Sequence, residues 1–187
     1  MIYDDIDWEQ NWLETLKDNP LEKEATSRKD QWVKRWDDIA EKFNEINKPT
    51  GLCENDCYVG NIISRIEFNK DSTILDIGSG PGTLSIPLAK KVRHVTSIDV
   101  SKNMIKLVEK NMKKEGITNI TTLNKSWEDV KLGKDIEKHD IVIASRSLGG
   151  LNLKNNLLKI MDATMEKAYI SSLAKGNDLD RTKNGRS

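Results

Sequence analysis

Residues 74–84 read ILDIGSGPGTL, and this stretch decides the fold because a buried strand runs directly into a turn with three glycines in five residues. Glycine has no Cβ, so such a turn can adopt positive φ and bring its backbone close to a ligand. The free amides of a following helix attract an anionic group. The stretch therefore predicts a strand, a ligand-binding turn and a helix in direct succession.

The glycine spacing argues against a nicotinamide dinucleotide as the ligand. The dinucleotide fingerprint is Gly-x-Gly-x-x-Gly, and counting from Gly78 places Thr83 where its third glycine should stand. A nicotinamide-dependent oxidoreductase therefore stays a remote alternative. A purely structural turn is a second alternative, because glycines also allow a helix to pack tightly on a strand.

Two acidic residues accompany the glycine turn. Asp76 precedes the first glycine by two positions, and Asp99 ends the next apolar run, residues 95–99. Carboxylates at the ends of two consecutive strands suit a ligand that carries an ammonium group and a diol.

Residues 76–82, together with Asp99, resemble the cofactor site of class I S-adenosylmethionine-dependent methyltransferases. S-adenosyl-L-methionine has no phosphate, so its site must offer a close backbone for the methionine part, an acid for the ammonium and an acid for the ribose hydroxyls. The resemblance assigns these roles to the glycine turn, Asp76 and Asp99. It covers roughly residues 36–173, and its specific part is confined to residues 76–104.

The resemblance also implies how the adenosine is held. Residues 99–104 (DVSKNM) look like the family's second motif, in which the acid holds the ribose diol and the methionine packs near the adenine. Ser126 stands where many relatives place an acid on the adenine amino group, so its hydroxyl, backbone groups and stacking on Trp127 are expected to replace that acid. Simple packing is the alternative for Trp127. The expected cofactor-binding residues are Asp76, Gly78, Ser79, Gly80, Gly82, Asp99, Val100, Met104, Ser126, Trp127 and Ser145.

On the acceptor side, residues 36–44 are similar to the opening helix of many of these enzymes, so Trp36 and Phe43 are expected beside the cofactor and substrate. The fourth strand ends in residues 144–150 (ASRSLGG), without the Asp- or Asn-Pro-Pro signature of relatives that methylate exocyclic amines of bases. Ser145 and Arg146 lie where the methyl should be transferred. Arg146 is expected to bind an anionic substrate through its planar fork, with a surface or helix-capping role as the alternative.

The sequence names no catalytic residue. Methyl transfer is an in-line displacement, for which alignment of a good nucleophile supplies most of the help. His94 and His139 are expected at strand entrances, opposite the edge where ligands bind. Cys53 and Cys57 have no further ligands of suitable spacing, so we expect reduced thiols and no metal site.

Beyond the glycine turn, the pattern predicts an α/β fold with a Rossmann-like doubly wound parallel sheet. Apolar strand runs alternate with helices, which implies helices on both faces of the sheet. Right-handed crossovers then order the strands 3-2-1-4-5, and ligands bind where that order reverses, beside the first strand. The strands are expected at residues 73–77, 94–99, 119–123, 140–145 and 167–173, and the helices at 83–91, 101–115 and 154–165.

Residues 1–70 are expected to form a helical cap that belongs to the same domain as the core, residues 71–173, with a polar tail at 174–187. The cap holds eight of the ten aromatic residues. A helix over residues 27–47 and a short helix beginning near Tyr58 are predicted. Its tryptophans, which recur four residues apart, are expected to pack, to form a lid over the cofactor, or both.

Composition excludes several classes of function. The chain has 187 residues, enough for one domain, and 30 basic residues balance 30 acidic ones. Nucleic acid is therefore not an expected partner, since its binding domains usually carry a basic footprint. The chain has no apolar run near the ~20 residues of a membrane span, and its acidic start is unlike a signal peptide. We expect a cytoplasmic protein.

The complete family fold adds two further strands after the fifth, which the polar residues 174–187 cannot rebuild. The strand at 167–173 is therefore expected to form an open edge unless a second copy or a partner chain pairs with it. We expect a methyltransferase that acts on a small-molecule or protein acceptor. The alternative is a catalytically inactive or partner-dependent subunit that binds S-adenosylmethionine.

Overall fold

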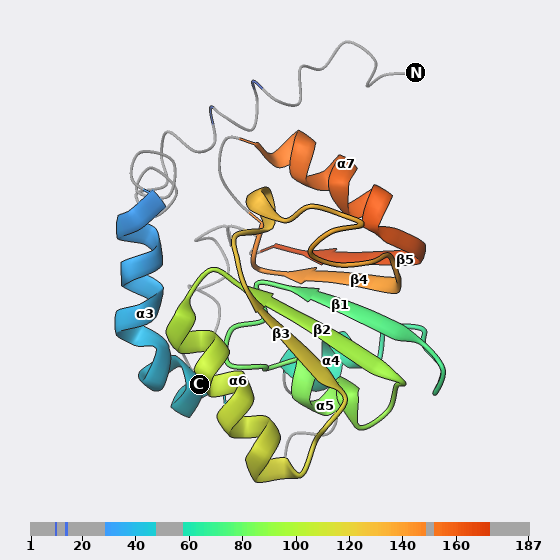
Figure 1. Cartoon of the computed structure of the whole chain (residues 1–187), viewed down its shortest axis with the longest axis horizontal. Helices are drawn as coiled ribbons and strands as arrows, with labels where there is room; N and C mark the ends of the chain where they lie inside the picture. Colours follow the sequence, from blue (N-terminus) through green and yellow to red (C-terminus); the bar gives the residue numbers. More distant parts are fainter. Residues whose placement is uncertain (1–9, 11–13, 15–28, 48–57, 149–151, 173–187) are drawn as a thin grey trace, which may run out of the picture.

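The computed structural model describes residues 10, 14, 29–47, 58–148 and 152–172. Its centre is a five-stranded parallel sheet in the order β3-β2-β1-β4-β5 (Figure 1). The predicted fold class and strand order are therefore confirmed. The strands are β1 Thr73–Ile77, β2 His94–Asp99, β3 Ile120–Asn124, β4 His139–Ser145 and β5 Thr164–Ser171.

The helices alternate with the strands as the pattern predicts. Their bounds are α3 Lys29–Ile46, α4 Tyr58–Ile63, α5 Ser85–Ala89, α6 Lys102–Glu115 and α7 Leu153–Ala163, with a 3-10 turn η1 at Trp127–Asp129. Helix α6 shows why these bounds hold. The Oγ of Ser101 accepts a hydrogen bond from the Met104 amide at its start, and Gly116 ends it in the left-handed conformation.

Several elements differ from the predicted bounds, and α5 and β5 differ most. Helix α5 has only five residues instead of the predicted 83–91, because Gly82 at φ +87° keeps the turn going up to the cap at Leu84. Strand β5 begins at Thr164, three residues before the predicted start, because α7 ends at Ala163 and the chain passes straight into the sheet.

Hydrophobic clusters lie on both faces of the sheet. Period-2 alternation sends Ile74 to one face and Leu75 to the other. The first face is covered by α5 and α6, with Leu88 and Val108 in its cluster. The second is covered by η1 and α7, with Ile160 in its cluster. This two-sided burial explains the continuous apolar runs of the strands.

Helix α3 lies against α6, at the edge of the sheet where the glycine turn is found (Figure 1). Its apolar stripe packs as predicted: Trp32 and Trp36 meet edge to face at 5.6 Å, and Trp36 and Phe43 at 5.7 Å. Asp37 joins the two helices, because its Oδ1 accepts hydrogen bonds from the Ser101 hydroxyl (2.5 Å) and the Asn103 amide (3.0 Å). The contacts of α3 fix it beside the predicted site.

Several predictions fall on residues outside the described ranges. These are the pair Trp8 and Trp12, the pair Cys53 and Cys57, and the polar tail at 174–187. Within the described ranges, none of the helices combines the length and apolar character needed to cross a membrane.

Candidate functional site

The three glycines of the turn all have positive φ, and an added Cβ would meet different neighbours at each. At Gly78 (φ +68°) an added Cβ would overlap the Cβ of Ser147, and at Gly82 (φ +87°) it would lie 2.9 Å from the Cγ1 of Ile86. The protein's own chain therefore makes the close approach at these two positions. At Gly80 (φ +55°) only the Cε1 of Phe43 comes near, at 3.6 Å. Gly80 is thus the glycine that the packing leaves least enclosed.

Asp99 is connected directly to this turn. Its Oδ2 accepts a hydrogen bond from the Gly80 amide and its Oδ1 one from the Ser101 amide, both at 2.8 Å. The residue is 8% exposed, and its burial raises the pKa of the carboxyl against the opposing effect of these backbone donors. Each carboxylate oxygen can accept a further hydrogen bond. Asp99 is therefore suited to hold a ligand hydroxyl beside Gly80.

Asp76 is buried and hydrogen-bonded within the protein. It is 2% exposed, and its Oδ2 accepts a 2.6 Å hydrogen bond from the hydroxyl of Ser85, which in turn accepts one from Ser97 at 2.7 Å. Burial raises the pKa of this carboxyl to about 6. Asp76 thus has a hydrogen-bond partner inside the protein, and its contact with a ligand ammonium stays a prediction.

The turn carries polar atoms without partners. Within the described part of the chain, the hydroxyls of Ser79 and Thr83 are buried and make no hydrogen bond. Such a group costs free energy unless a ligand or water satisfies it. Ser79 lies between Gly78 and Gly80, so its hydroxyl is available to a polar group held at the turn. This arrangement fits the methionine part of the expected cofactor.

Two of the residues expected beside the adenine, Met104 and Trp127, are buried. Met104 is 1% exposed and packs with Ala40 and Leu107 between α3 and α6. Trp127 is 7% exposed, its Nε1 donates to the carbonyl of Asn156, and the Nζ of Lys159 lies 4.7 Å from its ring centroid. Both side chains are therefore buried in packing, and their contact with an adenine stays a prediction.

Val100 and Ser126 keep their predicted position. They follow β2 and β3 at the same edge of the sheet, and both are partly exposed. The ends of β2 and β3 are joined by the Lys125 amide, which donates a 3.0 Å hydrogen bond to the carbonyl of Asp99. The contact of Val100 and Ser126 with an adenine stays a prediction.

At the ends of β4 and β5, three hydroxyls lie together. Ser145 pairs with Ser171 across the two strands, with 2.8 Å between their Oγ atoms. The hydroxyl of Tyr58, from α4, contacts Ser145 and lies 3.3 Å from Ser171. Arg146 follows with φ +56° and its guanidinium carbon 3.6 Å from the centroid of the Tyr58 ring. Ser145 and Arg146 are therefore adjacent to a cluster that the sequence did not predict.

The structure brings the predicted residues into two groups. Phe43 and Asp99 meet the glycine turn on one side of β1, while Ser145 and Arg146 lie at the end of β4 on the other. Trp36 meets Phe43 edge to face and packs, like Phe43, against the cluster of Ala40, Met104 and Leu107. Tyr58, Ser147 and Ser171 were missed, since the sequence offered only an apolar helix and two ordinary serines as signals.

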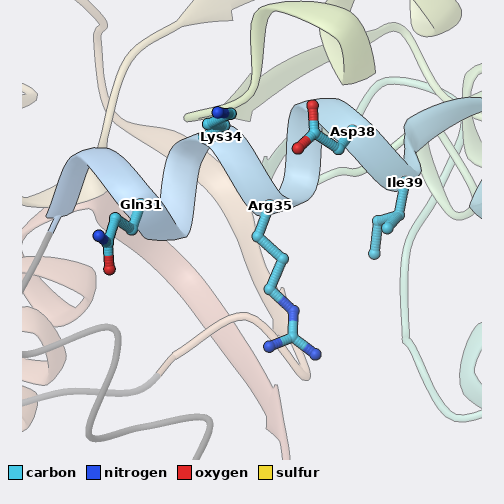
Figure 2. Close-up of a pocket in the computed structure, with 5 residues that line it drawn as sticks. All are labelled: Gln31, Lys34, Arg35, Asp38 and Ile39. Carbon is cyan, nitrogen blue, oxygen red and sulfur yellow. The ribbon is translucent and has the colours of Figure 1, made fainter.

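Two hollows of the described structure lie away from Asp99. One, of about 340 Å³, is lined by Gln31, Lys34, Arg35, Asp38 and Ile39 of α3 (Figure 2). Figure 2 shows Gln31, Arg35 and Ile39 leaving the same side of the helix. The other, of about 90 Å³, lies behind the turn beside Thr83. Neither contains Asp99 or Arg146, so we place the site by the sheet topology and the turn.

His94 and His139 begin β2 and β4 at the opposite edge of the sheet, as expected. The Nε2 of His139 shares a 2.7 Å hydrogen bond with Thr96, and burial lowers the pKa of both histidines. Among the described residues, no group of three or more metal-ligating side chains comes together.

Comparison with known proteins gives a consistent picture. A family model described as a methyltransferase domain matches residues 68–177. An uncharacterised protein of Haemophilus influenzae is 30% identical over 148 residues, which cover 78% of this chain and 52% of that protein. A probable ribosomal RNA small subunit methyltransferase A of Methanosphaera stadtmanae is 31% identical over 111 residues, which cover 58% of this chain and 40% of that protein. The chain thus spans about half the length of these relatives, or less.

Among solved structures, precorrin 8W decarboxylase of Methanobacterium thermoautotrophicum is similar in fold, with a TM-score of 0.54 and 24% identity. The match covers 65% of this chain and 64% of that one.

Proposed function

Because the chain belongs to the class I S-adenosylmethionine-dependent methyltransferase family, we propose that it transfers a methyl group from S-adenosyl-L-methionine to an acceptor bound at the carboxyl ends of β4 and β5. When bound, the cofactor supplies a methyl group on a positively charged sulfur, which is open to in-line attack. The acceptor's lone pair forms the new bond, and the electrons of the broken bond stay on the sulfur.

The observation that carries the proposal is the contact between Asp99 and Gly80. The strand order reverses at β1, which is where ligands bind in open parallel sheets. At this point the Gly80 amide donates to the Asp99 carboxylate, and the neighbouring Ser79 hydroxyl is buried without a partner in the described structure. In the proposal Asp99 holds the ribose diol and the turn holds the methionine part.

The surrounding residues prepare the site for a cation. The carboxyls of Asp76 and Asp99 are both buried, so they act in surroundings of low polarity where charge interactions are strong. With a pKa of about 6, Asp76 is largely ionised at neutral pH. In our proposal its negative charge favours the cofactor's ammonium and sulfonium. Phe43 of α3 lies beside the turn, where its Cε1 would be 3.6 Å from a Cβ at Gly80.

No described side chain is assigned as a general acid or base. Positioning of the two reactants can supply a large part of the rate of a displacement. Both histidines lie at the far edge of the sheet, so they do not serve an acceptor at the ends of β4 and β5. The residues of the site therefore bind and orient in this proposal.

Calorimetric titration of the full chain tests the proposal, with S-adenosylhomocysteine and NAD as alternative ligands. We expect S-adenosylhomocysteine to bind at one site per chain and NAD to give no heat of binding. Binding of NAD alone would contradict the proposal and favour an oxidoreductase. Retention of a labelled methyl group on an added acceptor then separates an active enzyme from a subunit that only binds the cofactor.

A further inference from the structure

The ends of β4 and β5 lie on the opposite side of β1 from Asp99. If the ribose is held at Asp99, the methyl group has to point away from β2, toward the part of the carboxyl edge formed by β4 and β5. The groups that line this part are Ser145, Arg146 and Ser171, with Tyr58 from α4. This inference therefore rests on the proposed function, and it concerns what these groups recognise.

Arg146 has an unusual backbone conformation. At φ +56° it is the one non-glycine residue with positive φ among the described residues. This conformation is unfavourable for a side chain with a Cβ and persists only where the surroundings impose it, most often at functional sites. Here the Arg146 amide donates a 2.8 Å hydrogen bond to the carbonyl of Ser171, and Ser147 is fixed against Gly78 with its hydroxyl bonded to Ile77.

The imposed conformation places the guanidinium on an aromatic support. Its central carbon lies 3.6 Å from the centroid of the Tyr58 ring, which is a cation–π contact. Arg146 is exposed, and no carboxylate of the described residues pairs with it. Stacking uses the face of the guanidinium and leaves its edge donors free for a planar, bidentate contact with an oxyanion.

The hydroxyl cluster beneath the arginine completes the site. The hydroxyls of Tyr58, Ser145 and Ser171 contact one another, which fixes the Tyr58 ring. Each hydroxyl can donate one hydrogen bond and accept two, so the cluster can reorient a donor toward an anionic group. A guanidinium fork with hydroxyl donors beside it is a chemical match for a carboxylate or a phosphate.

We propose that Arg146, held on Tyr58 beside Ser145 and Ser171, binds the carboxylate or phosphate group of a small-molecule methyl acceptor. A small molecule is favoured over a nucleic acid because the chain has equal numbers of acidic and basic residues. Nucleic-acid affinity depends on several cations that neutralise successive phosphates. At the described ends of β4 and β5, the guanidinium of Arg146 provides a single such cation.

The test is an NMR titration of the full chain saturated with S-adenosylhomocysteine, with inorganic phosphate and with acetate in separate arms. The shifts of the Ser145, Arg146 and Ser147 amides report binding. We expect at least one anion to bind, and the tighter one identifies the group as phosphate or carboxylate. Arg146→Gln should weaken it by about 10- to 100-fold, the equivalent of a hydrogen bond to a charged group.

Three further variants make the result specific. Arg93→Gln removes the same charge from an exposed arginine at the opposite edge of the sheet, and it should leave anion affinity unchanged. Arg146→Lys should weaken the affinity, because an ammonium cannot form the bidentate contact. Arg146→Gly removes the guanidinium and the backbone strain together, so it should lose anion binding without lowering the thermal unfolding midpoint.

The outcomes separate the two proposals. A wild-type chain that binds S-adenosylhomocysteine but neither anion overturns this inference and leaves the proposed function standing. An Arg146→Gln variant that binds the anion as tightly as the wild type also overturns it, as does tight binding of an RNA oligonucleotide in preference to both anions. Failure of the wild type to bind S-adenosylhomocysteine overturns the proposed function itself.

Discussion

Ser147 lies directly against Gly78, so the end of β4 is joined to the first glycine of the turn that follows β1. The hydroxyl of Ser147 donates a 2.5 Å hydrogen bond to the carbonyl of Ile77, and a Cβ at Gly78 would overlap the Cβ of Ser147. Since Arg146 immediately precedes Ser147, this contact connects the proposed cofactor turn to the proposed acceptor site.

The contact between Ser147 and Gly78 predicts that Gly78→Ala destabilises the protein more than the strain of an alanine at positive φ alone would. Any alanine at φ near +68° is strained, and here it also collides with Ser147. Gly116→Ala is the matched control, because Gly116 has φ +66° and nothing within 4 Å of an added Cβ. In chemical denaturation, Gly78→Ala should lower the free energy of unfolding by about 1–3 kcal/mol more than Gly116→Ala does. This difference is the usual cost of overpacking.

A second substitution tests the cause. Ser147→Gly removes the atom that an alanine at position 78 would meet, so the double variant should recover part of the lost free energy of unfolding. Equal losses for Gly78→Ala and Gly116→Ala, with no recovery in the double variant, would show that Ser147 does not enclose the turn.

Asp76 predicts a pH dependence of stability. Its pKa is raised from 3.8 to about 6 by burial, so ionisation disfavours the folded state. This destabilisation is small below pH 4, grows as the pH rises from about 4 to about 6, and levels off above that. Relative to Asp76→Asn, the wild type should therefore lose on the order of 3 kcal/mol of unfolding free energy between pH 4 and pH 7.

Asp140 provides a control of opposite sign. Hydrogen bonds from the amide and hydroxyl of Thr73 lower the pKa of the Asp140 carboxyl. Relative to Asp140→Asn, the wild type should therefore gain stability as the pH rises through the acidic range and lose it as the pH falls. A difference between Asp76→Asn and the wild type that stays constant from pH 4 to pH 7 would contradict the buried placement of Asp76.

Trp127 is predicted to support the fold without touching the cofactor. Its ring is buried among residues that include Leu75 and Ile160. Trp127→Leu should lower the free energy of unfolding by on the order of 3 kcal/mol, as is typical for truncating a buried aromatic ring. Calorimetry at a temperature where the variant is folded should give an unchanged affinity for S-adenosylhomocysteine. A large loss of affinity for S-adenosylhomocysteine would instead indicate that the Trp127 ring stacks on the adenine.

Asp99 is predicted to determine cofactor affinity. Asp99→Asn removes the charged acceptor proposed for the ribose diol while keeping the shape of the side chain. We expect the affinity for S-adenosylhomocysteine to fall by about 1.5–3 kcal/mol, the range for hydrogen bonds to a charged group. Asp162→Asn makes the same change at an exposed position of α7 and should have no effect. Equal affinities for the two variants would remove Asp99 from the site.

The sequence predicted the sheet well because its signals are local. Strand β1 and strand β2 have the predicted bounds, since each is a short apolar run that ends in a turn signal. The order of all five strands followed from the handedness of the connections. The glycine turn and Asp99 were also placed at the edge of the sheet by these local signals.

The direction of individual side chains was predicted less well. The sequence did not predict that Asp76 is buried: alternation in β1 puts it on the same face as Ile74, which α5 and α6 cover. Met104 and Trp127 are buried because α3 and α7 pack over them. A motif fixes where a residue lies along the chain, whereas its exposure depends on elements that are distant in sequence.

The cluster around Tyr58 shows the same limit. Tyr58 and Ser145 are 87 positions apart, and only the folded chain brings their hydroxyls together. In the sequence, Tyr58 belongs to an apolar helical stripe, which predicts packing. Nothing local indicates that its ring supports Arg146.

A crystal structure of the full chain with S-adenosylhomocysteine tests the central claim most directly. We predict that the ribose hydroxyls lie within hydrogen-bonding distance of the Asp99 carboxylate and that the methionine part lies against Ser79 and Gly80. A ligand bound elsewhere, or one whose sugar does not reach Asp99, would contradict the account.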